Sequence, residues 1–503
     1  IGDAGTAAWL AAVCASLWVA HPLQTESVTY ICQRYESAMG MFYLLTLYGF
    51  IRATEGQHVR MWGAIAIAAS ALGMASKENM ITAPLTVLLY DYVFLSAVGS
   101  HVIRERWRMH AALMGTWLVL AGLTAQRVQA NLEAGVPTIS PISPVDYLLT
   151  QFGVILHYLQ LSVFPYRLCL DYLWPPAERW TEILPPALLI TALVFATVWA
   201  AKRRAPAGYA GAWFFVILAP TSSLIPMGDM AFEHRMYLSL AAPICLIIVG
   251  GYRAIRSLGL RGGPWIGAGA GGALLIAAIG LTLSRNTDYR SGIGMWQDVV
   301  AKRPANCRAH VALAAAFLGE RKYEESEAAY RRVLETVDRL DRNRGGGYRL
   351  SPVMARYYRQ AGLNGLGQAL IGERRWVEAA ECFQKAVEVG GGAVSVYHLA
   401  QTLLLLGRNE DALKTCESAL ARRPELGPAH VLRGLLLEQA KRYAEAAASY
   451  RKALQLLPGD MAASCRLAWL LATCPEEAIR DGAEAARLAR AVCRETGGFN
   501  GRT

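Results

Sequence analysis

Residues 393–426 read AVSVYHLAQTLLLLGRNEDALKTCESALARRPEL, and residues 427–460 read GPAHVLRGLLLEQAKRYAEAAASYRKALQLLPGD. The two stretches align without a gap at a period of 34 residues, with Ala412 opposite Ala446. Further matched pairs are Ala400 with Gly434, Ala419 with Ala453, and Pro424 with Pro458. Small residues at such places let two antiparallel helices approach closely, and proline ends the second helix. A fixed period of this length predicts stacked helical hairpins.

The pattern extends to both sides of these two repeats. We expect further copies at about 307–338 and 360–392, a half repeat at 290–304 before them, and a degenerate copy at 461–495 after them. Residues 285–503 thus resemble the tetratricopeptide repeat family. The resemblance implies an α-solenoid whose inner groove holds a peptide. By the family's pattern the groove is lined by Asn364, Gln368, Tyr397, Gln401, Val431 and Leu435. Ordinary solvated helix faces are the alternative for the polar members.

Charge density separates this region from the rest of the chain. Up to residue 290 the chain has 19 basic and 15 acidic side chains, whereas the remaining 213 residues have 31 and 24. Apolar stretches of about 15 to 20 residues recur in the first part, which suits helices that cross a membrane. This difference in charge density between the two parts excludes a single soluble globular domain. We therefore expect residues 1–284 to form a multi-pass transmembrane helical domain, so that the whole chain is all-α.

Basic residues of the first part lie in short clusters between the apolar stretches, as cytoplasmic loops do, which argues against a nucleic-acid partner. The clusters are Arg104, Arg106 and Arg108, then Lys202, Arg203 and Arg204, then Arg253, Arg256 and Arg261. The loops at 21–37, 77–79 and 226–236, and everything after residue 284, then face the opposite side. The protein is expected in a bacterial inner membrane with periplasmic repeats, or in an endoplasmic reticulum membrane with luminal ones.

One apolar segment, residues 145–165, does not fit this alternation. If it crossed the membrane, one of the basic clusters would lie on the wrong side. We therefore expect it to be re-entrant or to lie along the interface.

Ionisable residues gather in the loops that face away from the cytoplasm. They are His21, Glu26, Arg34 and Glu36 in the first loop, Lys77 and Glu78 in the second, and Glu233, His234 and Arg235 in the third. Such groups are costly beside hydrocarbon unless they pair or bind a ligand. Cations next to apolar helices suit the phosphate of a lipid. Mutual ion pairing and snorkelling at the interface are the alternative. The ten cysteines lack metal-type spacing, and we expect no metal ligands.

Four motifs carry a second resemblance. They are HPLQTESVTYICQRYES at 21–37, TAPLTVLLYDY at 82–92, FPYRLCLDYLWP at 164–175 and FEHRMYLS at 232–239. Together with the repeats they resemble the protein O-mannosyltransferases that carry transmembrane segments and tetratricopeptide repeats, and their bacterial relatives. The resemblance implies a C-type glycosyltransferase that takes sugar from a polyprenyl phosphate without a cofactor. The loop residues above would surround the carrier phosphate and sugar.

The same resemblance places the family's catalytic acidic residues in the first outward loop. The chain starts after the corresponding region, so we expect it to be truncated at its N-terminus. The catalytic carboxylate is then expected upstream of residue 1, and metal dependence stays undetermined.

These features favour an integral-membrane enzyme. It would transfer a hexose, with mannose expected, from a polyprenyl phosphate to Ser or Thr of exported proteins, and the repeats would present the acceptor protein or peptide. One alternative is a membrane-anchored repeat scaffold for envelope or secretion complexes. Another is a ligase or polymerase of lipid-linked glycans.

Overall fold

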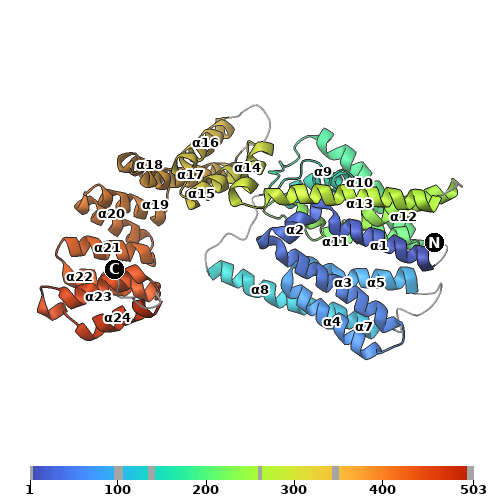
Figure 1. The fold of residues 1–503 in the computed structure, drawn as a ribbon, viewed down its shortest axis with the longest axis horizontal. Helices are drawn as coiled ribbons and strands as arrows, with labels where there is room; N and C mark the ends of the chain where they lie inside the picture. The colour runs from blue at the N-terminus through green and yellow to red at the C-terminus, as the bar shows by residue number, and fades with distance from the viewer. Residues whose placement is uncertain (1–3, 96–105, 134–141, 259–262, 343–349, 496–503) are drawn as a thin grey trace. The chain divides into compact units, whose positions relative to one another are not determined.

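The computed structural model describes residues 4–95, 106–133, 142–258, 263–342 and 350–495. All regular elements among these residues are helices, which confirms the all-α prediction. The chain divides into two compact units, Ile1–Pro304 and Ala305–Thr503 (Figure 1). We expected the division at 284/285. The difference is the helix at Gly292–Lys302, predicted as a half repeat, which groups with the first unit.

The first unit contains thirteen α-helices among its described residues. They are α1 (Ala4–Ala20), α2 (Thr25–Thr29), α3 (Arg34–Thr54), α4 (Val59–Ser76), α5 (Ala83–Tyr90), α7 (Trp107–Gly115), α8 (Trp117–Glu133), α9 (Pro144–Val163), α10 (Trp180–Lys202), α11 (Pro206–Leu218), α12 (Ala241–Ser257), α13 (Gly263–Asp288) and α14 (Gly292–Lys302). Short 3₁₀ turns lie between some of them, at Pro22–Gln24 (η1), Ile31–Gln33 (η2), Glu78–Thr82 (η3) and Glu233–Met236 (η5).

Four stretches of described helix are long and apolar enough to cross a membrane. They are Val59–Ser76, Trp107–Ala130, Trp180–Lys202 and Gly267–Asp288. The stretch Ala4–Ala20 becomes a fifth if it is taken together with Pro22–Thr29 across a bend of 52°. The first unit is thus a multi-pass membrane domain. Because lipid is itself apolar, such helices expose apolar side chains, as α10 does with Leu188 and Phe195.

Helices α3 and α4 pack closely against each other as an antiparallel pair, and small residues make this possible. The position where a Cβ on Gly49 would stand lies 3.1 Å from the Cβ of Ala66. Backbones approach this closely in membranes only where the side chains are small. The pair therefore connects the first polar loop to the second. Arg34 begins α3 and Lys77 directly follows α4, so the two residues lie at the same end of the pair.

Segment 145–165 corresponds to α9, which is not among the spans above. Its Gln151 donates to the carbonyl of Met230 at 3.1 Å, and its Tyr147 hydroxyl donates to the carbonyl of Thr221 at 2.6 Å. These polar side chains are buried against the third loop. The re-entrant or interfacial position stays a prediction.

Asp91, at the C-terminal end of α5, is fully buried and is held by polar partners. It accepts hydrogen bonds from Arg106, at 2.5 Å, and from His110, at 2.9 Å. Arg106 and Arg108 belong to a predicted cytoplasmic cluster, whereas Arg104 lies outside the described residues. Since Lys77 and Glu78 precede α5 and Asp91 follows it, the two polar regions lie at opposite ends of this helix.

The second unit consists of helix pairs that correspond to the predicted repeats. The helices are α15 (Cys307–Gly319), α16 (Tyr323–Arg342), α17 (Pro352–Gly372), α18 (Trp376–Glu388), α19 (Ala393–Leu405), α20 (Asn409–Arg422), α21 (Gly427–Gln439), α22 (Tyr443–Leu456), α23 (Met461–Thr473) and α24 (Gly482–Glu495). The equivalent small residues Ser326, Ala379, Ala412 and Ala446 are each 0% exposed. Their burial confirms that the repeats depend on close helix packing.

Substituting Gly365 by alanine is expected to destabilise the second unit. A Cβ at this position would lie 2.1 Å from the buried ring of Tyr330, so that the ring must move. Overpacking of this kind costs about 1–2 kcal/mol even after the gain in helix propensity. Urea unfolding of the full chain in detergent, followed by circular dichroism, measures the loss. The control Gly459→Ala, with no atom within 4 Å of the new Cβ, should leave the midpoint unchanged.

Candidate functional site

The three loops predicted to face away from the cytoplasm meet in one buried cluster. The backbone N–H of His234 donates to Glu26 Oε2 at 2.9 Å, and its Nδ1 lies 2.7 Å from Glu26 Oε1. His234 Nε2 is 3.8 Å from Glu36 Oε1, and the Lys77 ammonium donates to the same oxygen. The four side chains are at most 7% exposed. They form a continuous chain of alternating carboxylates and cationic or imidazole groups, hereafter the loop cluster.

Tight turns position the polar residues of the three loops, which come from distant parts of the sequence. His21 precedes η1, and its Nδ1 accepts a hydrogen bond from the N–H of Leu23 at 3.3 Å. Lys77 is the residue between α4 and η3, and Glu233 to Arg235 lie within η5. Short 3₁₀ turns satisfy backbone groups locally while the chain reverses. The side chains can therefore point inward without leaving main-chain donors unpaired beside lipid.

Burial controls the protonation of Lys77. Removal from water lowers its pKa to about 8, although the nearby Glu78 and Glu26 carboxylates favour the charged form. The ammonium also lies 4.9 Å from the centre of the Tyr35 ring. With this pKa the lysine is still mostly charged at neutral pH. Its ammonium donates to the Glu36 carboxylate.

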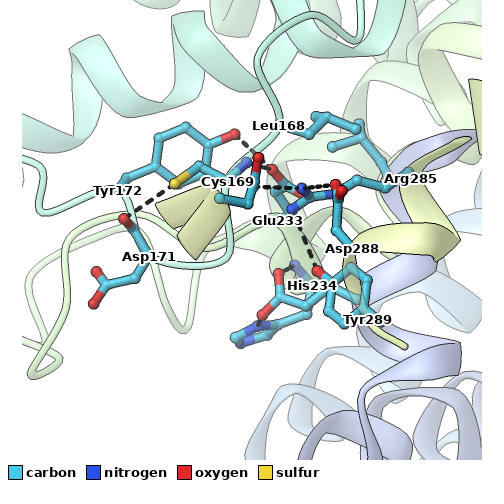
Figure 2. Close-up of polar contacts among 12 residues, drawn as sticks. Leu168, Cys169, Asp171, Tyr172, Glu233, His234, Arg285, Asp288 and Tyr289 are labelled. Atoms are coloured by element: carbon cyan, nitrogen blue, oxygen red, sulfur yellow. Dashed lines mark hydrogen bonds and ion pairs between the residues drawn. The ribbon is translucent and has the colours of Figure 1, made fainter. Parts of the chain in front are cut away.

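Glu233 anchors a second group of contacts, which Figure 2 shows. Its Oε1 accepts hydrogen bonds from the backbone N–H of Cys169 at 2.5 Å and from the Tyr172 hydroxyl at 2.7 Å. Arg285 Nη2 lies 3.7 Å from Oε2. Because the side chain is 0% exposed, desolvation raises the pKa of Glu233 to about 7. This carboxyl ties the segment at 164–175 to the third loop.

Residues at the end of α13 and on α14 contact the residues around Glu233. Arg285 also donates to Asp288 at 2.9 Å (Figure 2) and to Asp298 at 3.1 Å, and its guanidinium lies 5.2 Å from the centre of the Tyr289 ring. Lys302, on α14, donates to the carbonyl of Leu168 at 2.6 Å. None of these residues was predicted. Charged residues at helix ends are common, and no local pattern marks those that reach another loop.

Arg235 has a different set of partners from Lys77. Its guanidinium donates to the carbonyls of Thr221, Met230 and Asp229 at 3.1, 3.0 and 2.7 Å, and to the Tyr147 hydroxyl at 3.2 Å. Arg235 therefore stabilises the third loop by binding main-chain carbonyls, two of which belong to that loop. The predicted contact between Arg235 and a carrier phosphate stays a prediction.

Three predicted residues lie at the edge of the loop cluster. Arg34 and Glu78 are exposed, in contrast to their buried neighbours. His21 borders an apolar cavity of about 210 Å³ between α1, α12 and α13. The cavity is also lined by Leu17, Ser162, Ile244, Ile247, Leu274 and Leu281. The structure thus brings polar loop residues to the edge of an apolar space.

The predicted groove residues lie on α17, α19 and α21, the first helices of three repeats. Asn364 Nδ2 donates to Ser395 Oγ at 3.0 Å, and Gln368 Nε2 is 3.2 Å from His398 Nε2. Tyr397, Gln401, Val431 and Leu435 are half-buried. Asn364 and Gln368 therefore also connect adjacent helices. Over the described residues, no group of three or more His, Cys, Asp or Glu side chains could hold a metal ion.

Two family models match separate parts of the chain. Residues 5–123 match the family described as dolichyl-phosphate-mannose-protein mannosyltransferase. Residues 278–341, 364–428 and 397–460 match the tetratricopeptide repeat. The chain is also similar to the protein O-mannosyl-transferase Tmtc2 of Drosophila melanogaster, with 30% identity over 169 residues. The match covers 32% of this chain and 17% of that protein.

Solved structures of repeat proteins also resemble the chain. YrrB, described as a tetratricopeptide protein with an unusual peptide-binding site, has 15% identity and a TM-score of 0.29, and the match covers 41% of this chain and 93% of YrrB. The PilF protein of Pseudomonas aeruginosa has 18% identity and a TM-score of 0.33, with 43% and 87% covered.

The resemblance of the sequence is confirmed by the two family matches and by the fly relative, since the matched regions occur in the expected order. Residues 5–123, in the membrane unit, are similar to the family described as dolichyl-phosphate-mannose-protein mannosyltransferase, and segments that match the tetratricopeptide repeat follow them in the chain.

Proposed function

We propose that this protein is a membrane glycosyltransferase that moves mannose from a polyprenyl phosphate to Ser or Thr hydroxyls of exported proteins. The observation that carries the proposal is the meeting of three loops in the loop cluster, together with an apolar cavity bordered by His21 of the first loop. The match to mannosyltransferases supports the reaction class. A polyprenyl-phosphate sugar has a charged headgroup on an apolar chain, which is the combination that such a site can accommodate.

The cavity bordered by His21 suits the isoprenoid end of the carrier. Its lining from α1, α12 and α13 is aliphatic, so that burial of hydrocarbon there is favourable. His21 belongs to the same loop as Glu26 and Glu36. An isoprenoid chain in the cavity would therefore leave its phosphate near the first loop.

Two cations are placed to neutralise that phosphate. Arg34 is exposed at the start of α3, and Lys77 holds its charge close to Glu36. An incoming phosphate would share the Lys77 ammonium with Glu36, and Arg34 could bind two of its oxygens at once. In the reaction the acceptor oxygen bonds to the anomeric carbon while the bond to phosphate breaks. The electron pair leaves with the phosphate, and Lys77 and Arg34 stabilise it.

The hydroxyl proton of the acceptor requires a base. We propose that this base is a carboxylate upstream of residue 1, as the resemblance implies, rather than a member of the loop cluster. Glu26 and Glu36 are already engaged with His234 and Lys77. The scaffold alternative, in contrast, requires none of these charges, and the glycan ligase alternative differs only in the acceptor.

We further propose that the loop cluster and the repeats lie on the non-cytoplasmic side. Helix α3 begins at Arg34 and ends near Arg52, and α4 returns from Arg60 to Lys77. The positive-inside rule places Arg52 and Arg60 in the cytoplasm. Arg34 and Lys77 would then be periplasmic or luminal.

Arg34→Ala in the full-length protein is expected to lower mannose transfer to an acceptor peptide by about a hundredfold, which is typical for loss of one charge-stabilising donor. Because Arg34 is exposed, the stability of the fold should not change. Transfer assays with a polyprenyl-phosphate mannose measure the effect. The control is Arg60→Ala, an exposed cation near the other end of the α3–α4 pair. Undiminished transfer by the Arg34 variant would favour a scaffold.

Carrier binding is expected to weaken by about tenfold per pH unit above pH 8, because Lys77 loses its proton there. Fold stability should change in the opposite direction. The folded pKa of Lys77 lies below its unfolded value, so the unfolded state binds more protons and stability rises between about pH 8 and 10.5. Unfolding therefore cannot imitate the effect. Lys77→Arg, which stays charged, should abolish the alkaline loss of binding; if both proteins lose affinity alike, another group titrates.

A thiol reagent that cannot cross membranes should label the exposed Cys32 from the non-cytoplasmic side. The experiment uses a variant in which Cys32 is the only cysteine. A matched variant without Cys32 but with Arg60→Cys should react only after the membrane is permeabilised. Labelling in the reverse pattern would contradict the orientation.

A further inference from the structure

The first helices of the repeats lie next to one another in the order α15, α17, α19, α21 and α23. Each repeat contributes two residues to one face of this row. They lie fifteen and eleven positions before the buried small residue of the same repeat. In the last repeat the equivalent positions follow one period of 34 after Val431 and Leu435. We call this set the inner row. Its members are Val311, Ala315, Asn364, Gln368, Tyr397, Gln401, Val431, Leu435, Cys465 and Trp469.

No member of the inner row carries a charge, although about a quarter of the residues after 290 do. Many charged residues of the repeats form ion pairs on or just before the second helices, for example Arg331 with Glu327 at 2.6 Å and Arg442 with Glu445 at 2.7 Å. Charged residues of the first helices that lie outside the inner row, such as Arg359 and Arg433, pair with acidic residues of neighbouring helices, at 2.8 and 3.6 Å. A charged ligand on the inner row would lose water without gaining a counter-charge, which is unfavourable. The charge distribution therefore selects against acidic and basic segments.

The chemical type of the side chains also changes along the inner row. Amide side chains at Asn364, Gln368 and Gln401 occupy its middle, where they can hydrogen-bond to peptide groups. The end formed by Val431, Leu435 and Trp469 is apolar. Trp469 is 65% exposed, which is unusual for so large an apolar side chain. Exposed tryptophan is the residue type most often found at the centre of binding energy in interfaces.

We propose that the inner row binds an extended, uncharged peptide segment with a large apolar side chain at the Trp469 end. This inference rests on the proposed function, in which the repeats present the acceptor, and it names the class of acceptor. Five adjacent helices spaced by about 9 Å span about 36 Å. An extended strand of about eleven residues covers that distance.

The test measures binding of fluorescent peptides to the full chain in nanodiscs. The probe is a peptide of about twelve residues of Ser, Thr, Gly and Ala with one terminal Phe, and the two comparison peptides carry three Asp or three Lys. We expect the neutral peptide to bind at least tenfold more tightly than either charged one. Its affinity should not change between about 50 and 500 mM salt. Preference for a charged peptide, or strong salt dependence, would overturn the inference.

Two variants identify the surface. Trp469→Ala should weaken binding of the neutral peptide at least tenfold. Gln401→Glu should make the Lys peptide bind more tightly than the neutral one. The control Val377→Ala removes an apolar side chain that is 63% exposed on the second helix α18, and it should have no effect. If Trp469→Ala instead converts a dimer to a monomer without changing peptide binding, the apolar end joins two copies and the inference is wrong.

A transfer assay separates this inference from the proposed function. If the neutral peptide binds but receives no mannose, the glycosyltransferase proposal fails while the inner row stands. If transfer proceeds with the same KM in the wild type and in Trp469→Ala, the inner row does not select the acceptor and only the present inference fails.

Discussion

The structure of the membrane unit depends on the pairing of buried charges at the membrane boundary. Glu26, His234, Glu36 and Lys77 come from three loops, and each is stable in its buried position only because the next one is present. Removing one partner from such a chain leaves an uncompensated charge, which is far more costly than the pair itself. The loop cluster therefore holds the three loops together.

Glu233 and Arg285 extend this constraint to α14. The carboxyl of Glu233 binds the segment at 164–175, and Arg285 connects it to Asp298 on α14. Lys302 closes the arrangement by donating to Leu168. The helix that precedes the repeats is thus anchored to the loops of the candidate site. The repeat unit has a different basis, since small buried residues such as Ala379 and Ala412 let its helices pack closely, whereas ion pairs such as Arg331–Glu327 and Arg408–Asp411 lie at partly exposed side chains.

Much of the fold was predictable, because it follows from local periodicity. The 34-residue period predicted the helix pairs, and long apolar stretches predicted membrane helices. The nine loop residues were also named in advance; seven of them are buried, and four of these meet in the loop cluster. Their individual partners were not predictable. Lys77 and Arg235 have the same charge and both lie in polar loops, yet one binds a carboxylate and the other binds main-chain carbonyls. Arg285 and Lys302 carried no signal, because their partners are more than a hundred residues distant or on another element.

The amino-acid order alone therefore establishes the helical class, the repeat period and the loops in which ionisable groups gather. Each of these depends on spacing along the chain, which hydrophobicity and helix geometry translate directly into structure. Which carboxylate meets which cation, how strongly burial shifts the pKa of Lys77 or Glu233, and that Arg34 stays exposed are decided by the tertiary structure. The physical reason is that desolvation and pairing depend on distances between segments far apart in sequence, and no local pattern encodes those distances.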